Sequence, residues 1–236
     1  MRFIWSAASH QGMVRQNNED ALYPDSAGES AEVVTLMVAD GMGGHVAGEV
    51  ASRLAVNAAA ATDELSPADR VAAGNRAIRE EVAREPSLEG MGTTMTLVTL
   101  DPAGKARFAH VGDSRAYHYR KGELRQVTQD HTVAAEYVSQ GRIAPEEAAS
   151  HPQRHMLTRT LGLTRFVNVD EIDLDLEAGD RILLCSDGLT EMVPDKLIGE
   201  VLDEKGVEEA AWRLIDLANA AGGLDNISVI VIEALD

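Results

Sequence analysis

Short apolar runs recur along the chain with the length and composition of buried strands. Eight segments rich in valine, isoleucine and leucine predict strands at residues 3–8, 33–39, 94–100, 105–111, 116–120, 167–174, 181–185 and 227–233. The sequence Asp101-Pro102-Ala103-Gly104 predicts a turn between two of them, and Lys121-Gly122 predicts another tight connection. Neighbouring strands are therefore expected to form hairpins.

Other segments repeat their apolar residues at helical spacing. They predict helices at residues 47–61, 67–84, 133–140, 194–203 and 207–221, the last of which stops at Gly222-Gly223. Hairpins argue against an all-parallel sheet. We therefore predict an α+β fold, with a mainly antiparallel, two-layer sheet and helices packed outside it.

One stretch, around residues 132–155, is polar and contains Gly141, Pro145 and Pro152. It predicts a mobile insertion that could act as a flap over a site. Repeats, low-complexity tracts and a domain linker are not evident in the sequence. The 236 residues suit one catalytic domain covering residues 1–236.

Charge and cysteine usage exclude several classes of protein. The net charge of −18 comes from 21 basic and 39 acidic residues and disfavours binding to nucleic acid or an anionic membrane. The single cysteine, Cys185, is read as a small buried apolar residue. Neither a signal peptide nor a run of ~20 apolar residues is present. We expect a cytoplasmic monomer, and a longer natural chain beyond Asp236 stays open.

The most informative feature is the position of four aspartates at the ends of apolar runs: Asp40, Asp113 and Asp187 come after such a run, and Asp225 comes just before one. A carboxylate at the end of a buried strand loses hydration, which is unfavourable unless a cation or several donors meet it. Glu19-Asp20 adds an acidic pair after the first strand. Taken singly, Asp40 and Asp187 could be ordinary Asp-Gly turns, and the acidic pair could be a solvated loop.

Together, these acids predict a cage for divalent metal. Two dications held close together repel strongly, and several carboxylates would offset that repulsion. Without cations, some of the carboxylates would take up protons. Cysteine and histidine do not accompany the acids at ligand spacing, and oxygen ligands favour Mg²⁺ or Mn²⁺.

Ordered motifs give the chain a resemblance to a known family. It resembles the metal-dependent protein phosphatases, the type 2C serine/threonine phosphatases, in their bacterial form. The matching segments cover nearly the whole chain in the family's order: GMVRQNNED (12–20), VADGMGGH (38–45), GTT (92–94), VGDSRA (111–116), QDHT (129–132), RTLG (159–162), SDGLT (186–190) and DNIS (225–228).

The resemblance implies a β-sandwich of two antiparallel sheets flanked by helices, with metals in a cleft at one edge. It implies that Asp40 bridges two metals and that Asp187 and Asp225 hold the first of them. The Gly41 carbonyl would bind the second, since glycine leaves a backbone oxygen open to close approach.

The remaining site residues follow from the same resemblance. Glu19 and Asp20 would act around the second metal, partly through water. Asp113 with Asp187 resembles the third-metal site of bacterial members. Arg15 matches the residue that grips the substrate phosphate, a task suited to its bidentate fork; the alternative is a surface ion pair with Glu19.

The implied reaction is hydrolysis of phosphoserine and phosphothreonine by a metal-bridging hydroxide, with two Mn²⁺ or Mg²⁺ ions and a third. The implied partners are phosphorylated proteins, including bacterial serine/threonine kinases and their substrates. One departure concerns the proton donor. Many eukaryotic members have histidine where this chain has Met42, so His45 is a candidate general acid, and a neutral loop histidine is the alternative.

Two other functions compete with this interpretation. A non-catalytic phosphoprotein-binding member is expected to lack one or more metal acids, and this chain has all of them. A phosphatase dedicated to an anti-sigma antagonist usually carries a sensor domain, for which 236 residues leave no room. The sequence does not identify the substrate.

Overall fold

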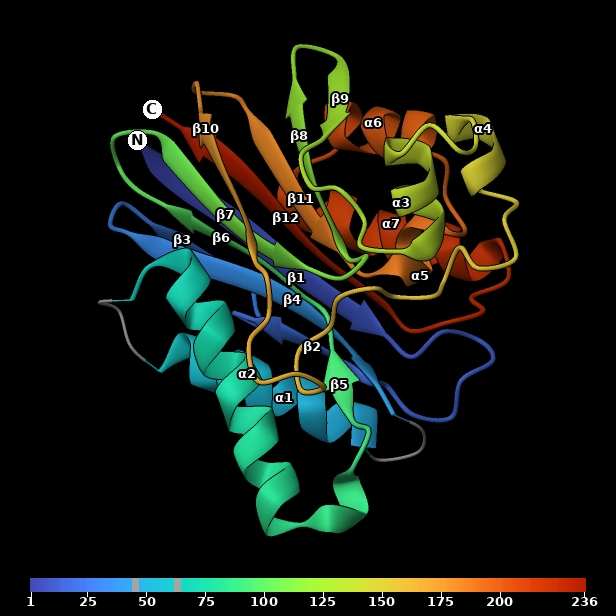
Figure 1. Ribbon diagram of the computed structural model, residues 1–236. Coiled ribbons are helices and arrows are strands. Elements are labelled where there is room, and N and C mark those ends of the chain that lie inside the picture. Colours follow the sequence, from blue (N-terminus) through green and yellow to red (C-terminus); the bar gives the residue numbers. More distant parts are fainter. Residues whose placement is uncertain (44–46, 62–64) are drawn as a thin grey trace.

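The computed structural model describes residues 1–43, 47–61 and 65–236. Its strands form two antiparallel sheets that pack face to face (Figure 1). The first sheet has the order β3-β1-β12-β11-β8-β9, with bounds Gly28–Ser30, Arg2–His10, Ile227–Leu235, Arg181–Cys185, Arg115–Arg120 and Glu123–Gln126. The second has the order β10-β7-β6-β4-β2, with bounds Asp170–Asp175, Lys105–Val111, Met95–Leu100, Val34–Met42 and Asp20–Tyr23. The short strand β5 (Gly92–Thr93) pairs with β4.

Helices cover the outer face of each sheet. Helices α1 (Ala47–Ala60) and α2 (Pro67–Arg84) pack on the second sheet, and α6 (Asp195–Glu204) and α7 (Val207–Ala220) pack on the first (Figure 1). The shorter helices are the 3₁₀ turn Pro86–Leu88, α3 (Val133–Ser139), α4 (Pro145–Ala148) and α5 (Asp187–Thr190). The predicted fold class, a two-layer antiparallel sandwich flanked by helices on both sides, is confirmed.

Both faces of the central strands are buried, which explains why their sequences are continuously apolar. In β12, Val229 and Val231 face the core beneath α6 and α7, whereas Ile230 and Ile232 face the core between the sheets. Alternate side chains of a strand point to opposite faces, so a strand covered on both sides needs no polar positions. Three apolar layers result: one between the sheets and one under each pair of helices.

Both predicted turns are confirmed. Strands β6 and β7 pair with Leu100 opposite Ala106, and the Asp101 side chain accepts a hydrogen bond from the Ala103 N–H at 2.9 Å. Strands β8 and β9 are joined through Lys121 and Gly122, which both have positive φ angles of 52° and 89°. Such φ angles match the right-handed twist of the flanking strands.

The strand that carries Asp40 differs from the prediction, because β4 does not end before this residue. Asp40 pairs with Asp20 of β2, and Gly41 and Met42 pair with β5. The ladder therefore continues beyond the apolar run. The predicted strand at 167–174 begins three residues later, at Asp170.

The polar stretch around residues 132–155 contains α3, as predicted, and the four-residue helix α4. In Figure 1 these two helices lie apart from α1 and α2. Residues of both helices line a second pocket together with Thr190 at the end of α5. Within the described part of the chain, no helix combines the length and apolar composition that crossing a bilayer requires.

Candidate active site

Acidic side chains from both sheets meet in one pocket. Asp40 lies in β4, Asp113 in the turn between β7 and β8, Asp187 at the start of α5 and Asp225 just before β12. All four line a pocket of about 790 Å³, together with Glu19, Gly41 and Arg15. The structure thus brings together these four aspartates, Glu19 and Gly41, which are spread over more than two hundred positions of the sequence. The Arg15 side chain lies in the same pocket. Asp20 lies beside them, opposite Asp40 in the sheet.

Thr94 fixes the backbone of Asp40. Its hydroxyl accepts a hydrogen bond from the Asp40 N–H at 2.9 Å, and its own N–H donates to the Asp40 carbonyl at 2.9 Å. The same hydroxyl lies 2.7 Å from the Ser114 hydroxyl, next to Asp113. A methyl group on Gly112 would come within 2.5 Å of the Thr94 side chain, so only glycine permits this approach. Thr94 therefore connects the backbones that carry two of the acids.

Gly41 sits where the backbone is crowded from two sides. A β-carbon at this position would lie 2.2 Å from the Gly48 carbonyl oxygen and 2.6 Å from the Glu19 carbonyl oxygen. The Gly41 N–H donates to the Glu19 carbonyl at 3.1 Å. The glycine predicted to approach a metal through its carbonyl is thus also required by packing.

Asn226 holds the loop that carries Arg15 and Glu19. Its side-chain oxygen accepts from the Glu19 N–H at 2.8 Å. Its amide nitrogen donates to the carbonyls of Gln11 at 2.9 Å and Asn17 at 2.8 Å. One buried side chain therefore joins the start of β12 to both ends of residues 11–19.

The carboxyl groups of Asp20 and Asp187 are poorly compensated. Ser186 donates to Asp20 Oδ2 at 2.8 Å, whereas Asp20 Oδ1 and Asp187 Oδ1 are buried without a hydrogen-bond partner. Burial raises the pKa of Asp20 to about 7, against the hydrogen bonds from Ser228 and Ser186. Burial, followed by repulsion from Glu191 and Asp225, raises the pKa of Asp187 to about 6.

The same effect reaches the other acids. Burial raises the pKa of Asp40 well above its ordinary value, and the charges of Asp20 and Asp187 raise it further. Burial, then the charge of Asp187, likewise raises the pKa of Asp113. Carboxylates that resist ionisation, with unpartnered buried oxygens among them, are what a hard divalent cation would satisfy. The residues present therefore fit Mn²⁺ or Mg²⁺.

Arg15 lies at the mouth of the pocket. Its Nη2 atom is 2.5 Å from Asp225 Oδ2, and its side chain is 55% exposed. This hydrogen bond is the main cause that raises the pKa of Arg15. The sequence left Glu19 open as an ion-pair partner of Arg15; the structure pairs Arg15 with Asp225.

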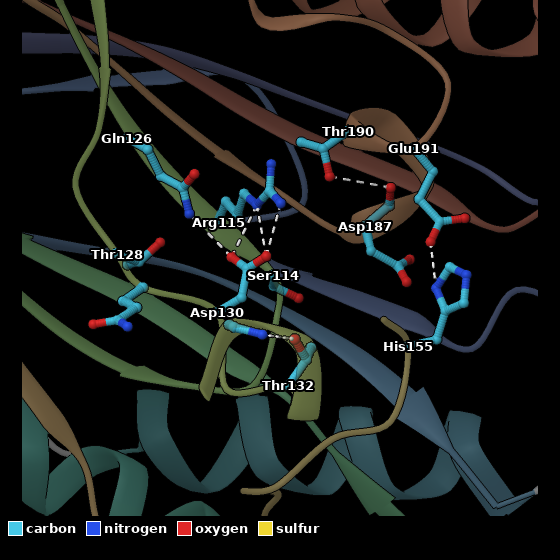
Figure 2. A network of polar contacts seen from close by, with 12 residues as sticks. Ser114, Arg115, Gln126, Thr128, Asp130, Thr132, His155, Asp187, Thr190 and Glu191 are labelled. Atoms are coloured by element: carbon cyan, nitrogen blue, oxygen red, sulfur yellow. Dashed lines mark hydrogen bonds and ion pairs between the residues drawn. The ribbon is translucent and has the colours of Figure 1, made fainter. Parts of the chain in front are cut away.

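His155, to which the sequence assigned no function, also lies beside the acids. His155 Nδ1 lies 2.5 Å from Glu191 Oε1, and Figure 2 shows this pair beside Asp187. One ligand atom from each of the three residues lies within 4.8 Å of the others. The sequence shows no histidine at ligand spacing from the acids. In the fold, however, His155 lies beside Asp187 and Glu191. More than thirty positions separate His155 from Asp187 and Glu191, so sequence spacing carried no signal. The candidate general acid His45 lies outside the described residues.

His131 links two elements of the fold through hydrogen bonds. Its Nδ1 accepts from the Gly112 N–H at 3.0 Å, and its Nε2 lies 3.1 Å from Asp170 Oδ2. It thereby ties the turn that carries Asp113 to β10. Cys185 is buried and unpaired, as predicted.

Comparison with known proteins assigns the family. Residues 8–205 match the sequence model of the family described as protein phosphatase 2C, so the chain belongs to that family. The family that the ordered motifs predicted is therefore confirmed.

Curated relatives are named for one activity. The chain is 45% identical over 240 residues to the serine/threonine protein phosphatase PstP of Mycobacterium tuberculosis, covering 98% of this chain and 45% of PstP. It is 38% identical over 236 residues to the serine/threonine phosphatase Stp of Listeria monocytogenes, covering 94% of this chain and 92% of Stp. The chain spans about half the length of PstP.

Solved structures agree with this assignment. A crystal structure of the M. tuberculosis phosphatase PstP/Ppp superposes with a TM-score of 0.91 at 44% identity and covers both chains completely. The PstP catalytic domain in complex with two manganese ions has a TM-score of 0.88 at 42% identity, again with complete coverage of both chains.

Proposed function

We propose that this protein is a metal-dependent phosphatase that hydrolyses phosphoserine and phosphothreonine in proteins. The observation that carries the proposal is the gathering of acids from both sheets around a pocket with Arg15 at its mouth. Two of these acids have buried carboxylate oxygens without a partner. Such a pocket favours cations, and an arginine at its mouth favours an anionic group.

We assign the acids as ligands of two Mn²⁺ or Mg²⁺ ions. Asp40 would bridge both, Asp187 and Asp225 would hold the first, and the Gly41 carbonyl would bind the second. Glu19 and Asp20 would act around the second ion, partly through water, and Asp113 with Asp187 would form a third site. The two manganese ions in the PstP catalytic domain support this assignment. When bound, divalent cations neutralise phosphoryl oxygens and supply a nucleophile from water near neutral pH.

Arg15 binds and orients the substrate phosphate. Its guanidinium can donate two parallel hydrogen bonds to phosphoryl oxygens. To do so, it exchanges its contact with Asp225 for the phosphate. Both Arg15 and Asp225 line the pocket in which the phosphate would bind. Proton delivery to the leaving alkoxide by His45 or by water stays a prediction.

The biological setting is proposed from the same assignment. Substrates are phosphorylated proteins, including serine/threonine kinases and their targets, and the phosphatase opposes those kinases in the cytoplasm as a monomer. Residues 1–236 act as one catalytic domain, with the segment around 132–155 serving as its flap.

The test is phosphatase activity under controlled metal. Purified protein is assayed on p-nitrophenyl phosphate and phosphopeptides with Mn²⁺, Mg²⁺ or chelator. We expect activity to vanish with chelator and to return with Mn²⁺. Asp40→Asn and Asp187→Asn should each abolish it, whereas Asp173→Asn, an exposed change on β10 outside the pocket, should not.

Two results would contradict the proposal. Full activity of Asp40→Asn or Asp187→Asn would show that the metal assignment is wrong. Calorimetry that detects no Mn²⁺ binding, together with binding of phosphoproteins without turnover, would favour the non-catalytic alternative.

A further inference from the structure

Exposed apolar side chains gather on one wall of the catalytic pocket. Met156 is 52% exposed, Leu163 52% and Phe166 80%, and all three line the pocket that contains the acids. They lie in one short segment between α4 and β10. Exposed large apolar groups that cluster at a pocket, unlike scattered ones, indicate a binding surface.

This apolar wall reaches the catalytic residues through Met42. Met42 also lines the pocket and lies two positions after Asp40. A β-carbon built on Gly92 would lie 3.6 Å from Met42 Cγ and 3.7 Å from Leu163 Cγ, so both side chains flank the same point. We call Met42, Met156, Leu163 and Phe166 the apolar strip. All four side chains line the pocket that contains the acids.

The backbone beneath the strip is held in place. Leu161 is fully buried and pairs with Thr93 through hydrogen bonds of 2.9 and 3.2 Å. Asn75 of α2 accepts from the Gly162 N–H at 2.7 Å and donates to the Thr164 carbonyl at 3.1 Å. Because the loop is ordered by these contacts, binding a partner on it does not require ordering the loop first.

The outermost member of the strip is oriented by its neighbour. The Arg165 guanidinium carbon lies 5.2 Å from the centroid of the Phe166 ring, a cation–π distance. Arg165 covers part of the ring, and most of the side chain still faces solvent. Phe166 thus presents apolar surface at the edge of the pocket.

We propose that the apolar strip binds an apolar side chain that flanks the phosphorylated serine or threonine of the substrate. This inference rests on the proposed phosphatase function and adds a sequence preference to it. An extended peptide rises about 3.3 Å per residue, so a neighbour of the phosphorylated residue reaches the wall that begins at Met42. An uncharged side chain also avoids repulsion from the acids beside it.

The experiment compares matched phosphopeptides. Short phosphothreonine peptides of equal charge carry either leucine or serine at each position on both sides of the phosphothreonine. For the wild type, we expect leucine at one or more positions to raise kcat/KM roughly tenfold over serine, a common effect of an apolar contact. In the double variant Leu163→Ser/Phe166→Ser, the ratio of kcat/KM for the leucine peptide to that for the serine peptide should fall below about threefold.

A matched control separates the strip from exposed apolar groups in general. Trp212 on α7 is 48% exposed and does not line the pocket, so Trp212→Ser should keep the wild-type ratio. Each ratio compares two peptides on the same enzyme, so partial loss of folded protein cancels. Light scattering of each variant reports self-association, the other use of an apolar surface.

The outcomes separate the two proposals. Equal rates on leucine and serine peptides, or a leucine-to-serine ratio that is unchanged in the double variant, would overturn the proposed role of the apolar strip. Hydrolysis of both peptides would still support the proposed phosphatase function. Concentration-dependent dimers lost in the double variant, with no peptide preference, would make the strip a self-association surface instead. No hydrolysis of any peptide or of p-nitrophenyl phosphate would remove the proposed function, and the strip's assignment with it.

Discussion

Replacing Asp187 with asparagine should stabilise the metal-free protein while it abolishes activity. The carboxyl group has a pKa of about 6 in the fold against an ordinary value of 3.8. Because the folded-state pKa is raised, the associated stability is complete below pH 3.8 and is lost as the pH rises through about 6. Above pH 7, an ionised Asp187 therefore works against folding, and an uncharged asparagine does not.

The size of the effect follows from the pKa difference. About two pKa units correspond to about 3 kcal/mol at pH 8. The asparagine amide keeps a polar group in the same enclosed place, so we expect a net gain of about 1–3 kcal/mol. For a chain of this size, that gain corresponds to a rise in Tm of roughly 2–10 °C. At pH 5 the gain should fall to about half, and at pH 4 it should nearly disappear.

The assay is urea unfolding of the wild type and Asp187→Asn in chelator at pH 8, 5 and 4, with Asp173→Asn as the control. Adding Mn²⁺ at pH 8 should stabilise the wild type by about 2–3 kcal/mol when the ion is near a hundredfold above its Kd. The variant should gain less. A variant no more stable than the wild type at pH 8, or a gain that does not depend on pH, would refute the reasoning.

Three further predictions concern single side chains. Thr94→Val removes the hydroxyl that accepts from the Asp40 N–H and should lower kcat/KM about tenfold on p-nitrophenyl phosphate, whereas Thr94→Ser should keep most of the activity. Arg15→Lys loses the bidentate fork and should lower kcat/KM about 10- to 100-fold with Mn²⁺ affinity, measured by calorimetry, largely kept. Burial, with the neighbouring His131, lowers the pKa of His110 to about 4 from 6.5, so acidification should protonate the unfolded chain first. Between pH 7 and 5 the wild type should lose about 2 kcal/mol more stability than His110→Gln, and equal losses in urea unfolding would contradict this.

The sequence predicted the elements whose signals are local. Runs of apolar residues in β12 and β4 persist because both faces of these strands are buried, and the two hairpins carry their own turn residues. The four short strands β2, β3, β5 and β9 were not predicted. They are too short to show a clear apolar pattern and exist because a neighbour supplies hydrogen bonds in register, as β4 does for β2.

The same distinction applies to the candidate site: residues with a local sequence signal were predicted, and residues that only the fold brings together were not. The acids Asp40, Asp113, Asp187 and Asp225 were found because each lies at one end of an apolar run and belongs to an ordered motif. His155 and Glu191 were missed, since their meeting depends on how residues 132–155 pack against α5. The apolar strip was missed for a related reason. Exposure of Leu163 and Phe166 reflects the anchoring of their loop by Asn75, which is nearly ninety positions away.

The central place of β12 has a consequence for synthesis of the protein. This last strand lies between β1 and β11 and pairs with β1 over nine residues, from Arg2–Leu235 to His10–Ile227. Until it emerges from the ribosome, β1 and β11 each expose a long edge that invites wrong pairing and chaperone binding. Asp225 emerges only just before it. A stalled or prematurely terminated polypeptide therefore lacks both the strand between β1 and β11 and one of the proposed metal ligands, so the proposed phosphatase activity requires that these residues have been translated.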